Sequence, residues 1–570
     1  MKNETIKKML GATLVLTMLV GTLVGCGNQV KSEKESESTD KISGESSISE
    51  VIKSSESIET EPELELEPVT LKWYYPGKEL EGTPDVIEAF NEKLAEVLPN
   101  TTVEFTFVDD YKTNWPMFLA GKEQMDIAWS GYSTPYYQDI LDGNIMGISD
   151  LINEYAPNLV QEMKIWELDW ASCTLDGEIY GIPCTQPTVK ECQALSYTNL
   201  LAPYMDQEAL LAEIDENYKL TEKMLDIIEA AFQGAIDDGV LKKGDPSWNF
   251  GWSIHLGGTM GYQKLTKNGQ IIYIDPEAEN PEPLFIWEIP EVRMCVERLA
   301  KWYDMGWLTD TEILNQLPAD SVTHFNFGYN WNNSWQGCDE RGVKEATVSK
   351  QPGVFIATNR PEEAYVDVSS IGTASTYLVI PYTAENPERA IMLLNILRDE
   401  VGTVGNDLLN MLVYGFEENS EEAKKYGWCN YTAVEEDGQM KVDKTILGEN
   451  SSKHSMTNWL MGNTFKIMHD GGSLTTVKQK DYAMNFFTNV YPNLKHSAIS
   501  GMFVDTSGFA TEMESVMSVY NEYCEQIGFG CGGVDKVDEV FDTAIAKLNE
   551  AGWIKVKAEL LNQIEAYNAK

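Results

Sequence analysis

Residues 69–129 read VTLKWYYPGKELEGTPDVIEAFNEKLAEVLPNTTVEFTFVDDYKTNWPMFLAGKEQMDIAW. Apolar, aromatic and β-branched residues predict three short strands in this stretch, at 69–75, 102–108 and 125–129. After the first strand, Thr83 is a candidate N-cap with Pro84 at the first helical position, and the apolar residues that follow recur at helical spacing. A second, short helix is expected at 115–120. This alternation predicts a parallel sheet with helical crossovers, in which ligands bind beyond the carboxyl ends of the strands.

The chain downstream of this stretch predicts a second region of mixed helices and strands. Residues 175–183, LDGEIYGIP, are typical of a tight hairpin turn followed by a strand that a proline ends. Residues 371–381 predict another apolar strand, and Asn386 with Pro387 opens a further helix. Helical periodicity also dominates three other segments, at 206–238, 290–305 and 511–568. A second α/β region is therefore expected after the first.

The first 68 residues have a different character from the rest. Three lysines precede an apolar run from Met9 to Val24, and Leu23-Val24-Gly25-Cys26 closes that run. This pattern predicts a lipoprotein signal peptide at 1–25, with Cys26 as the acylated (palmitate-bearing) first residue of the mature chain. A short transmembrane helix and an ordinary secretory signal are the alternatives. Residues 26–68 are rich in Ser and Glu, and their low hydropathy and high charge predict a disordered tether.

Charge and composition exclude several classes of function. The formal net charge is −47, so phosphate backbones are repelled and no nucleic-acid partner is expected. Eight cysteines besides Cys26 permit disulfides without fixing their connectivity. The five histidines are scattered and no pair of cysteines has metal-ligand spacing, so we expect no metal site and no cofactor.

Several segments together resemble a known family. They are VTLKWYYPG, MDIAWSGY, DGEIYGIP and ENPERAIMLLNIL, followed by GMFVDTSGFATEMESVMSVYNEYCEQIGFG and KLNEAGWIKVKAELLNQIEAY near the end of the chain. In this order, behind a lipoprotein signal and a Ser/Glu-rich tether, they resemble the extracellular solute-binding proteins of the family 1 type. These are the lipoprotein components of carbohydrate ABC importers. The terminal segments resemble the C-terminal extension of the oligosaccharide-binding lipoprotein subgroup.

The resemblance implies an α/β fold that forms a two-lobed, periplasmic-binding-protein-like clamp of type II, with a helical C-terminal extension. Hinge strands are expected near 180–183 and 371–381. The first part of lobe 1 would occupy 69–183, and the main part of lobe 2 would occupy 184–370. The hinge return, the remaining lobe segments and the helical region would then fill 371–570. Such a protein is no enzyme, because ligand contacts on both lobes shift the population to the closed form that a membrane permease recognises.

Candidate ligand-binding residues follow from the chemistry of sugars. A sugar ring has apolar C–H faces and a rim of hydroxyls, so its site needs flat aromatic rings together with hydroxyl, amide or carboxylate groups. Tryptophan and tyrosine more often pack in protein cores, which is the alternative for each aromatic candidate. Asp126 is expected to be structural. The candidates are Trp73, Tyr75, Trp129, Ser130, Tyr132, Tyr136, Tyr180, Asn330, Trp331, Trp335, Trp459 and Asn463.

The sequence therefore predicts a lipid-anchored protein on the extracytoplasmic face of the membrane. It would capture an intact solute, an oligosaccharide or another carbohydrate, and deliver it to ABC permease subunits. Two alternatives stay open at this point. One is a secreted surface glycoside hydrolase, which would need a pair of carboxylates flanking the sugar bond. The other is a surface adhesin without catalytic activity.

Overall fold

The structure is a computed structural model that describes most of the chain after residue 65. The described residues are 66–186, 193–244, 248–249, 260–265, 271–308, 322–329, 343–348, 351–358, 365, 375–436, 438–448, 450–468, 481, 484–485, 488–489 and 493–569. Within these ranges no helix combines the length and the apolar character needed to cross a membrane. The predicted signal peptide, Cys26 and the tether lie outside the described residues.

The first sheet has five strands in the order β2-β1-β3-β15-β6. Its members are β1 (Val69–Pro76), β2 (Thr101–Val108), β3 (Ile127–Gly131), β6 (Ile182–Pro183) and β15 (Thr376–Val379). Strand β1 pairs in parallel with both β2 and β3, as the sequence predicts. Strand β15 runs antiparallel to β3 and to β6. The two predicted hinge segments are therefore neighbours in one mixed sheet.

Helices and two hairpins accompany this sheet. The helices are α1 (Thr83–Val97), α2 (Tyr111–Gly121), α3 (Tyr136–Leu141), α4 (Ser149–Tyr155), α5 (Pro157–Ile165), α6 (Glu167–Ala171), α13 (Pro387–Ile396), α14 (Val404–Tyr414) and α15 (Glu421–Tyr426). The hairpins are β4 (Thr174–Leu175) with β5 (Glu178–Ile179), and β16 (Thr432–Glu436) with β17 (Gln439–Asp443). Asp176 and Gly177 both have positive φ in the first hairpin turn. That backbone shape suits the Asp-Gly pair that the sequence places there.

A second sheet lies in the middle of the chain, in the order β13-β14-β7-β12-β8. Its strands are β7 (Gln193–Thr198), β8 (Trp248–Asn249), β12 (Phe325–Tyr329), β13 (Val343–Val348) and β14 (Gln351–Ala357). A small antiparallel sheet follows the order β11-β10-β9, built from β9 (Gln263–Lys264), β10 (Ile272–Ile274) and β11 (Leu284–Phe285). Antiparallel pairing dominates here, whereas β12 and β8 are parallel.

Among the described residues, six helices of ten or more residues belong to this second region. They are α7 (Gln207–Glu216), α8 (Glu222–Asp237), α10 (Pro290–Asp304), α17 (Ala510–Gly528), α18 (Val537–Glu550) and α19 (Trp553–Asn568). Helix α8 shows how the sequence starts and orients such a helix: the Thr221 side chain caps it by accepting a hydrogen bond from Met224 N (3.2 Å). Met224, Ile228 and Phe232 then recur at helical spacing and are buried.

Short 3₁₀ turns complete the described elements: η2 (Ala202–Tyr204), η3 (Ile286–Glu288), η5 (Thr445–Leu447), η6 (Asn458–Leu460), η9 (Ser507–Phe509), η10 (Gly530–Gly532) and η11 (Val534–Lys536). One expected start signal is wrong in detail. Thr83 is the first residue of α1, and Gly82 is its N-cap. The Thr83 hydroxyl is engaged elsewhere, because it lies 3.0 Å from the ring nitrogen Nδ1 of His454.

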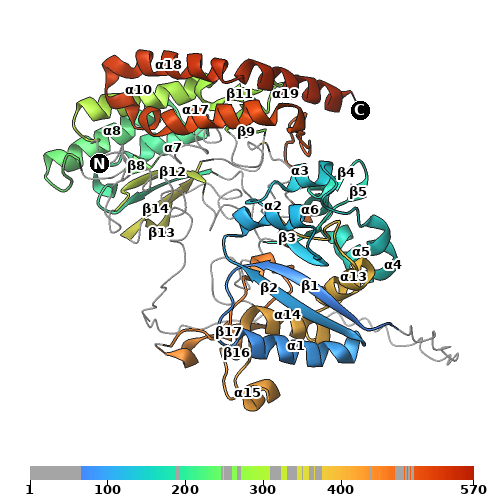
Figure 1. Cartoon of the computed structure of the whole chain (residues 1–570). Helices are drawn as coiled ribbons and strands as arrows, with labels where there is room; N and C mark the ends of the chain where they lie inside the picture. The colour runs from blue at the N-terminus through green and yellow to red at the C-terminus, as the bar shows by residue number, and fades with distance from the viewer. Residues whose placement is uncertain are drawn as a thin grey trace, which may run out of the picture. The chain divides into compact units, whose positions relative to one another are not determined.

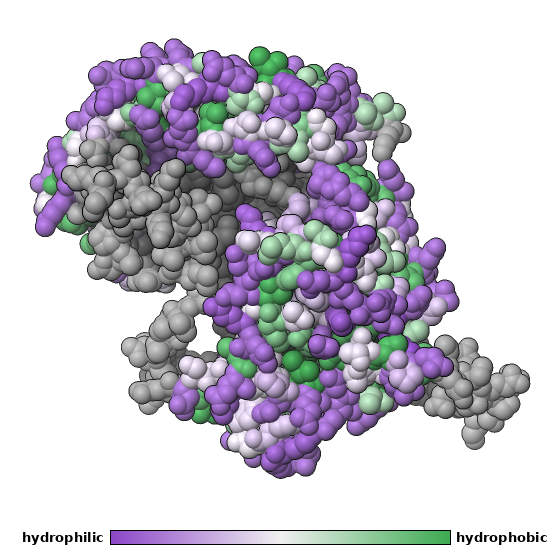
Figure 2. All heavy atoms as spheres, in the orientation of Figure 1, coloured by the Kyte–Doolittle hydropathy of each residue, from purple (hydrophilic) through white to green (hydrophobic). Residues whose placement is uncertain are grey.

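The buried apolar side chains form two main cores. One unites segments from residues 71–184 and 377–494, and we call this part the first lobe. The other unites segments from 195–356 and 499–564, and we call it the second lobe. The C-terminal helices α17, α18 and α19 thus share a core with α10, alongside which Figure 1 draws them. On the face shown in Figure 2, hydrophilic residues predominate, as the net charge of −47 leads one to expect.

Asp126 fixes the first sheet to α13. Its carboxylate is buried and accepts hydrogen bonds from the backbone nitrogens of Lys72 (2.9 Å), Glu385 (3.0 Å) and Asn386 (2.8 Å). One of these bonds satisfies a backbone donor of strand β1. The other two satisfy backbone donors at the start of α13, where a helix leaves its first N–H groups without partners. The structural role expected for Asp126 is the one that it has.

Candidate ligand-binding site

The carboxyl ends of β1 and β3 lie at one edge of the first sheet, because the two strands are parallel neighbours. Strand β1 ends at Pro76 and β3 ends at Gly131. The loop that follows β3, Tyr132–Pro135, leads directly into α3. In α/β sheets this edge is where ligands bind. We therefore build the candidate site around this loop.

Hydrogen bonds hold the loop in one shape. The Thr134 hydroxyl accepts from Gly131 N (2.8 Å) and lies 2.7 Å from the Ser130 hydroxyl. Tyr132 N donates to the carbonyl of Ser375 (2.8 Å) at the start of β15. Gly131 is required at this approach, since a Cβ there would stand 2.1 Å from that carbonyl oxygen. The loop is a rigid support for the side chain of Tyr132.

Tyr132 presents an aromatic ring to solvent at this edge. Its side chain is 44% exposed, and its ring meets the buried ring of Trp129 edge-on, with centroids 5.3 Å apart. Trp129 is braced in turn by Tyr111, whose hydroxyl donates to the Trp129 carbonyl (2.8 Å). An exposed ring on a rigid base is suited to stacking against an apolar face of a ligand.

Two buried polar atoms beside this loop have no hydrogen-bond partner within the described residues. They are Nε1 of Trp129 and the hydroxyl of Tyr136. The Tyr136 ring stacks on Tyr377 with centroids 4.2 Å apart, and a Cβ on Gly181 would lie 3.0 Å from its hydroxyl. Buried donors without partners cost free energy, so such atoms in a native protein point to a ligand or to water.

The tyrosines of this region are uncharged at physiological pH. Burial raises the pKa of Tyr75 to about 12, and burial also raises the pKa of Tyr132 and of Tyr136 above the usual value of 10. Phenols that keep their protons can donate as well as accept hydrogen bonds. The described part of the site therefore offers neutral hydroxyl and indole groups rather than fixed charges.

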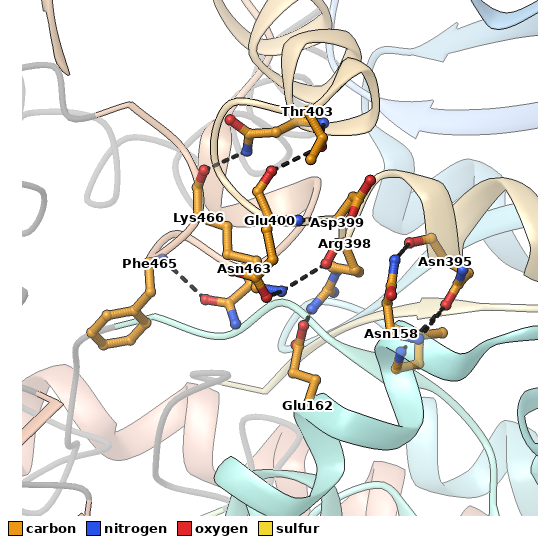
Figure 3. A network of polar contacts seen from close by, with 12 residues as sticks. Asn158, Glu162, Asn395, Arg398, Asp399, Glu400, Thr403, Asn463, Phe465 and Lys466 are labelled. Atoms are coloured by element: carbon orange, nitrogen blue, oxygen red, sulfur yellow. Dashed lines mark hydrogen bonds and ion pairs between the residues drawn. The ribbon is translucent and has the colours of Figure 1, made fainter. Parts of the chain in front are cut away.

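The segment that leaves the first lobe after β6 is held by polar contacts with residues of the network in Figure 3 and its neighbours. Arg398, at the end of α13, pairs with the buried Glu162 of α5 and donates to the Pro183 carbonyl (2.7 Å). Lys466 Nζ donates to the Arg398 carbonyl (2.7 Å). Thr464 reaches the segment after β6, with both its backbone nitrogen (2.9 Å) and its hydroxyl (3.0 Å) donating to the carbonyl of residue 185.

The structure places the remaining candidates differently from one another. Trp73 lies in the core, fully buried and stacked on Phe105. Tyr75 is buried, and its hydroxyl accepts from the nitrogen of Thr457 (2.6 Å). Asn463 is also buried, where its side-chain oxygen accepts from Phe465 N (3.0 Å). Packing or local hydrogen bonding accounts for these positions, although Nε1 of Trp73 is another buried donor without a partner among the described residues.

Six candidates remain. Ser130 is buried beside Thr134, and Tyr180 is half-buried between β5 and β6. The side chain of Trp459, together with Asn330, Trp331 and Trp335, lies outside the described residues. The structure thus brings Trp129 and Ser130 at the end of β3, Tyr132 in the following loop and Tyr136 at the start of α3 close together in the chain. Sequence reasoning did not single out Thr134 or Arg398, although the Thr134-Pro135 pair is a turn signal that could have marked the former.

Cysteines and metal ligands add no further site in this region. Cys173, Cys184, Cys295, Cys429, Cys524 and Cys531 are free thiols. Among the side chains that the structure describes, no group of three or more His, Cys, Asp or Glu residues is arranged to hold a metal ion.

Comparison with solved structures gives strong matches over most of the chain. The N-glycan transport solute binding protein NgtS from Streptococcus pneumoniae superposes with a TM-score of 0.63 at 16% identity, covering 88% of this chain and 100% of that one. The HMO-binding, ABC-transporter-associated solute binding protein from Bifidobacterium longum infantis gives 0.55 at 12% identity, with 88% and 99% covered. The chain has the fold of the ABC-transporter solute-binding proteins. The predicted two-lobed α/β class is therefore confirmed.

Two further comparisons concern the sequence itself. Residues 498–569 match a family model described as a domain of unknown function, DUF3502. This range contains both terminal segments that resemble the C-terminal extension of the oligosaccharide-binding subgroup, so the expected helical extension of the solute-binding-protein fold is present. No curated protein matches the chain in sequence.

Proposed function

We propose that this protein binds an intact oligosaccharide and delivers it to the permease of an ABC importer, without cleaving it. We further propose that Cys26 carries the lipid that holds the protein at the extracytoplasmic face of the membrane. The observation that carries the proposal is the loop after β3, where an exposed aromatic ring stands beside buried, unpartnered donors.

The chemistry of this loop suits a saccharide better than a charged solute. Tyr132 offers a ring face for C–H groups, and the phenol of Tyr136 and the indole of Trp129 are neutral hydrogen-bonding groups that are buried here and would meet sugar hydroxyls only once they are uncovered. A sugar hydroxyl that pairs with one of these donors removes the cost of leaving it unsatisfied in the empty protein.

The proteins with a similar fold support the same choice of ligand. Structures of NgtS include complexes with Man1GlcNAc and with Man5GlcNAc, at TM-scores of 0.59 and 0.56 to this chain. The similar Bifidobacterium protein is described as HMO-binding. Since the identities are 16% or less, these proteins guide the panel of ligands to be tested.

The test is a binding titration with the soluble chain from residue 27 onward. Mannose–GlcNAc oligosaccharides, milk oligosaccharides and monosaccharides would be titrated by isothermal calorimetry and tryptophan fluorescence. We expect saturable, reversible binding of at least one oligosaccharide, with no new reducing ends. Release of reducing sugar would support the hydrolase alternative instead, and absence of binding across the panel would contradict the proposal.

Tyr132→Ala tests the loop with a matched control. Loss of a stacking ring should weaken binding about tenfold, which corresponds to about 1.4 kcal/mol, and should lower the melting temperature only slightly, because the residue is 44% exposed and its packing includes the edge contact with Trp129. Tyr382 is the control, since it is 39% exposed and follows β15, which ends at the opposite edge of the sheet. If the Tyr132→Ala and Tyr382→Ala proteins bind the saccharide with equal affinity, the loop after β3 is not part of the binding site.

A further inference from the structure

A short segment at the start of the C-terminal domain, by which we mean residues 498–569, contacts the first lobe. We call residues 499–507 the strap. Neighbouring side chains of the strap pack against different cores: Met502 is buried in the core of the second lobe, whereas Phe503 packs against the core of the first. Val504 returns to the core of the second lobe. The strap is therefore a point where the two cores share one stretch of backbone.

Helix α19 holds the strap from the side of the second lobe. The side chain of Gln563 makes two hydrogen bonds to the backbone of Asp505: its oxygen accepts from Asp505 N (2.9 Å), and its nitrogen donates to Asp505 O (2.7 Å). One turn further along α19, the Tyr567 hydroxyl donates to the carbonyl of Ser500 (2.8 Å). Both side chains belong to the range 498–569 that matches the domain of unknown function.

The strap meets α3 on its other side. Thr506 donates twice to the side-chain oxygen of Gln138, from its backbone nitrogen (3.0 Å) and from its hydroxyl (2.8 Å). Gln138 is itself oriented, because its nitrogen donates to Asp142 (2.9 Å). Beside it, the rings of Tyr137 and Phe503 meet edge-on with centroids 4.4 Å apart.

Helix α3 is the element that begins where the candidate loop ends. It spans six residues, and its first residue is Tyr136, which carries one of the unpartnered donors. A helix this short is not stable by itself and depends on tertiary contacts. Contacts that fix the second and third residues of α3 therefore also fix where Tyr136 and the preceding loop stand.

We propose that the C-terminal domain positions the ligand-binding loop through the strap, with Gln138 as the positioning residue that receives it. Gln138 touches no ligand in this proposal and acts through α3. The part that concerns ligand affinity rests on the proposed function, whereas the contact itself is tested without ligand. This gives the domain of unknown function a role within the binding protein: it holds one wall of the site in the arrangement that binds.

The test compares three variants of the same soluble chain. Thr506→Val keeps the shape of the side chain and removes the hydroxyl that donates to Gln138. Thr506→Ser restores that hydroxyl. Thr543→Val makes the same chemical change in the same domain, where the hydroxyl of Thr543 bonds only within α18, to Glu539 O (2.7 Å). Hydrogen–deuterium exchange of 136–142 and of α1, and saccharide affinity, would be measured for each.

Loss of one hydrogen bond should speed exchange in 136–142 about fivefold in Thr506→Val, with α1 unchanged, and weaken saccharide binding about two- to fivefold. Thr506→Ser and Thr543→Val should match the wild type in both readouts. Equal exchange in Thr506→Val and Thr543→Val would overturn the proposal, as would faster exchange spread equally over α1. If exchange in α3 becomes faster while the saccharide affinity stays unchanged, the Thr506–Gln138 contact is only structural, and the positioning role is overturned. If the wild-type chain binds no saccharide, only the proposed function is contradicted. The hydrogen–deuterium exchange comparison still tests whether the strap stabilises α3, because it needs no ligand.

Discussion

Acidification from pH 7 to pH 5 should destabilise the first lobe through one histidine. His454 is buried, with Nε2 2.7 Å from the carbonyl of Leu412 and Nδ1 3.0 Å from the hydroxyl of Thr83. Because a carbonyl only accepts, Nε2 carries the proton and Nδ1 accepts from Thr83. Burial, with a smaller contribution from Lys444, lowers the pKa of His454 from 6.5 to about 4.

The sign and size of the effect follow from this pKa shift. Between pH 6.5 and pH 4 the unfolded chain binds a proton that the folded chain does not, so the free energy of unfolding falls as the pH falls. The full difference of about 2.5 pKa units is worth about 3 kcal/mol, of which about 2 kcal/mol is already lost at pH 5. With a urea slope of about 3 kcal/mol/M, the unfolding midpoint should fall by about 0.7 M.

Urea unfolding followed by tryptophan fluorescence at the two pH values measures this loss. His454→Gln places an amide donor and acceptor at the site and cannot titrate. Its urea midpoint should therefore fall by about 0.7 M less than that of the wild type. His496→Gln is the control, because it removes an exposed histidine. If wild type and His454→Gln lose the same stability between pH 7 and pH 5, the reasoning from burial is refuted.

Two further predictions concern the buried Arg398–Glu162 pair and the membrane anchor. Arg398→Met should lower the free energy of unfolding by about 3–5 kcal/mol, since it leaves the buried Glu162 charge unpaired, and the double variant Glu162→Met/Arg398→Met should recover part of that loss in urea unfolding. Lys424→Met breaks an exposed pair with Glu421 and should cost at most about 1 kcal/mol, and an Arg398→Met protein as stable as this control would contradict the stabilising role of the buried pair. Cys26→Ser should abolish incorporation of labelled palmitate into the protein; a variant that is still labelled would contradict lipidation at Cys26.

Much of the fold could be predicted because its signals are local. The strands and helices of residues 69–129 appear within a few residues of their expected bounds, and the Asp-Gly turn after β4 forms as its backbone preferences require. The pairing of β6 with β15 had no such signal, since about 190 residues separate partners such as Ile182 and Leu378. Local patterns identify a strand, but they do not name its partner.

The candidate site was predictable in kind and only partly in detail. Alternation in β1 correctly separates Trp73 and Tyr75, which pack with Phe105 and Phe107, from Tyr74, which meets Phe118 on the other face. Alternation did not reveal that the Trp73 face is covered, because a two-residue period tells which side chains share a face and not what packs on that face. The position of Tyr132 likewise depends on a segment far away in the sequence, because Gly131 packs against Ser375 and Tyr132 N donates to the Ser375 carbonyl.

The sequence alone determined the acidic character of the chain, its alternation of strands and helices, and the aromatic loop at the end of β3, since each depends on neighbouring residues and their periodicity. Tertiary structure decided which aromatic rings are buried in the core and which are exposed, which carboxylate pairs with Arg398, and which core the C-terminal helices join. These features depend on contacts between segments hundreds of residues apart. Their free energy comes from shared burial and geometry, which no local pattern records.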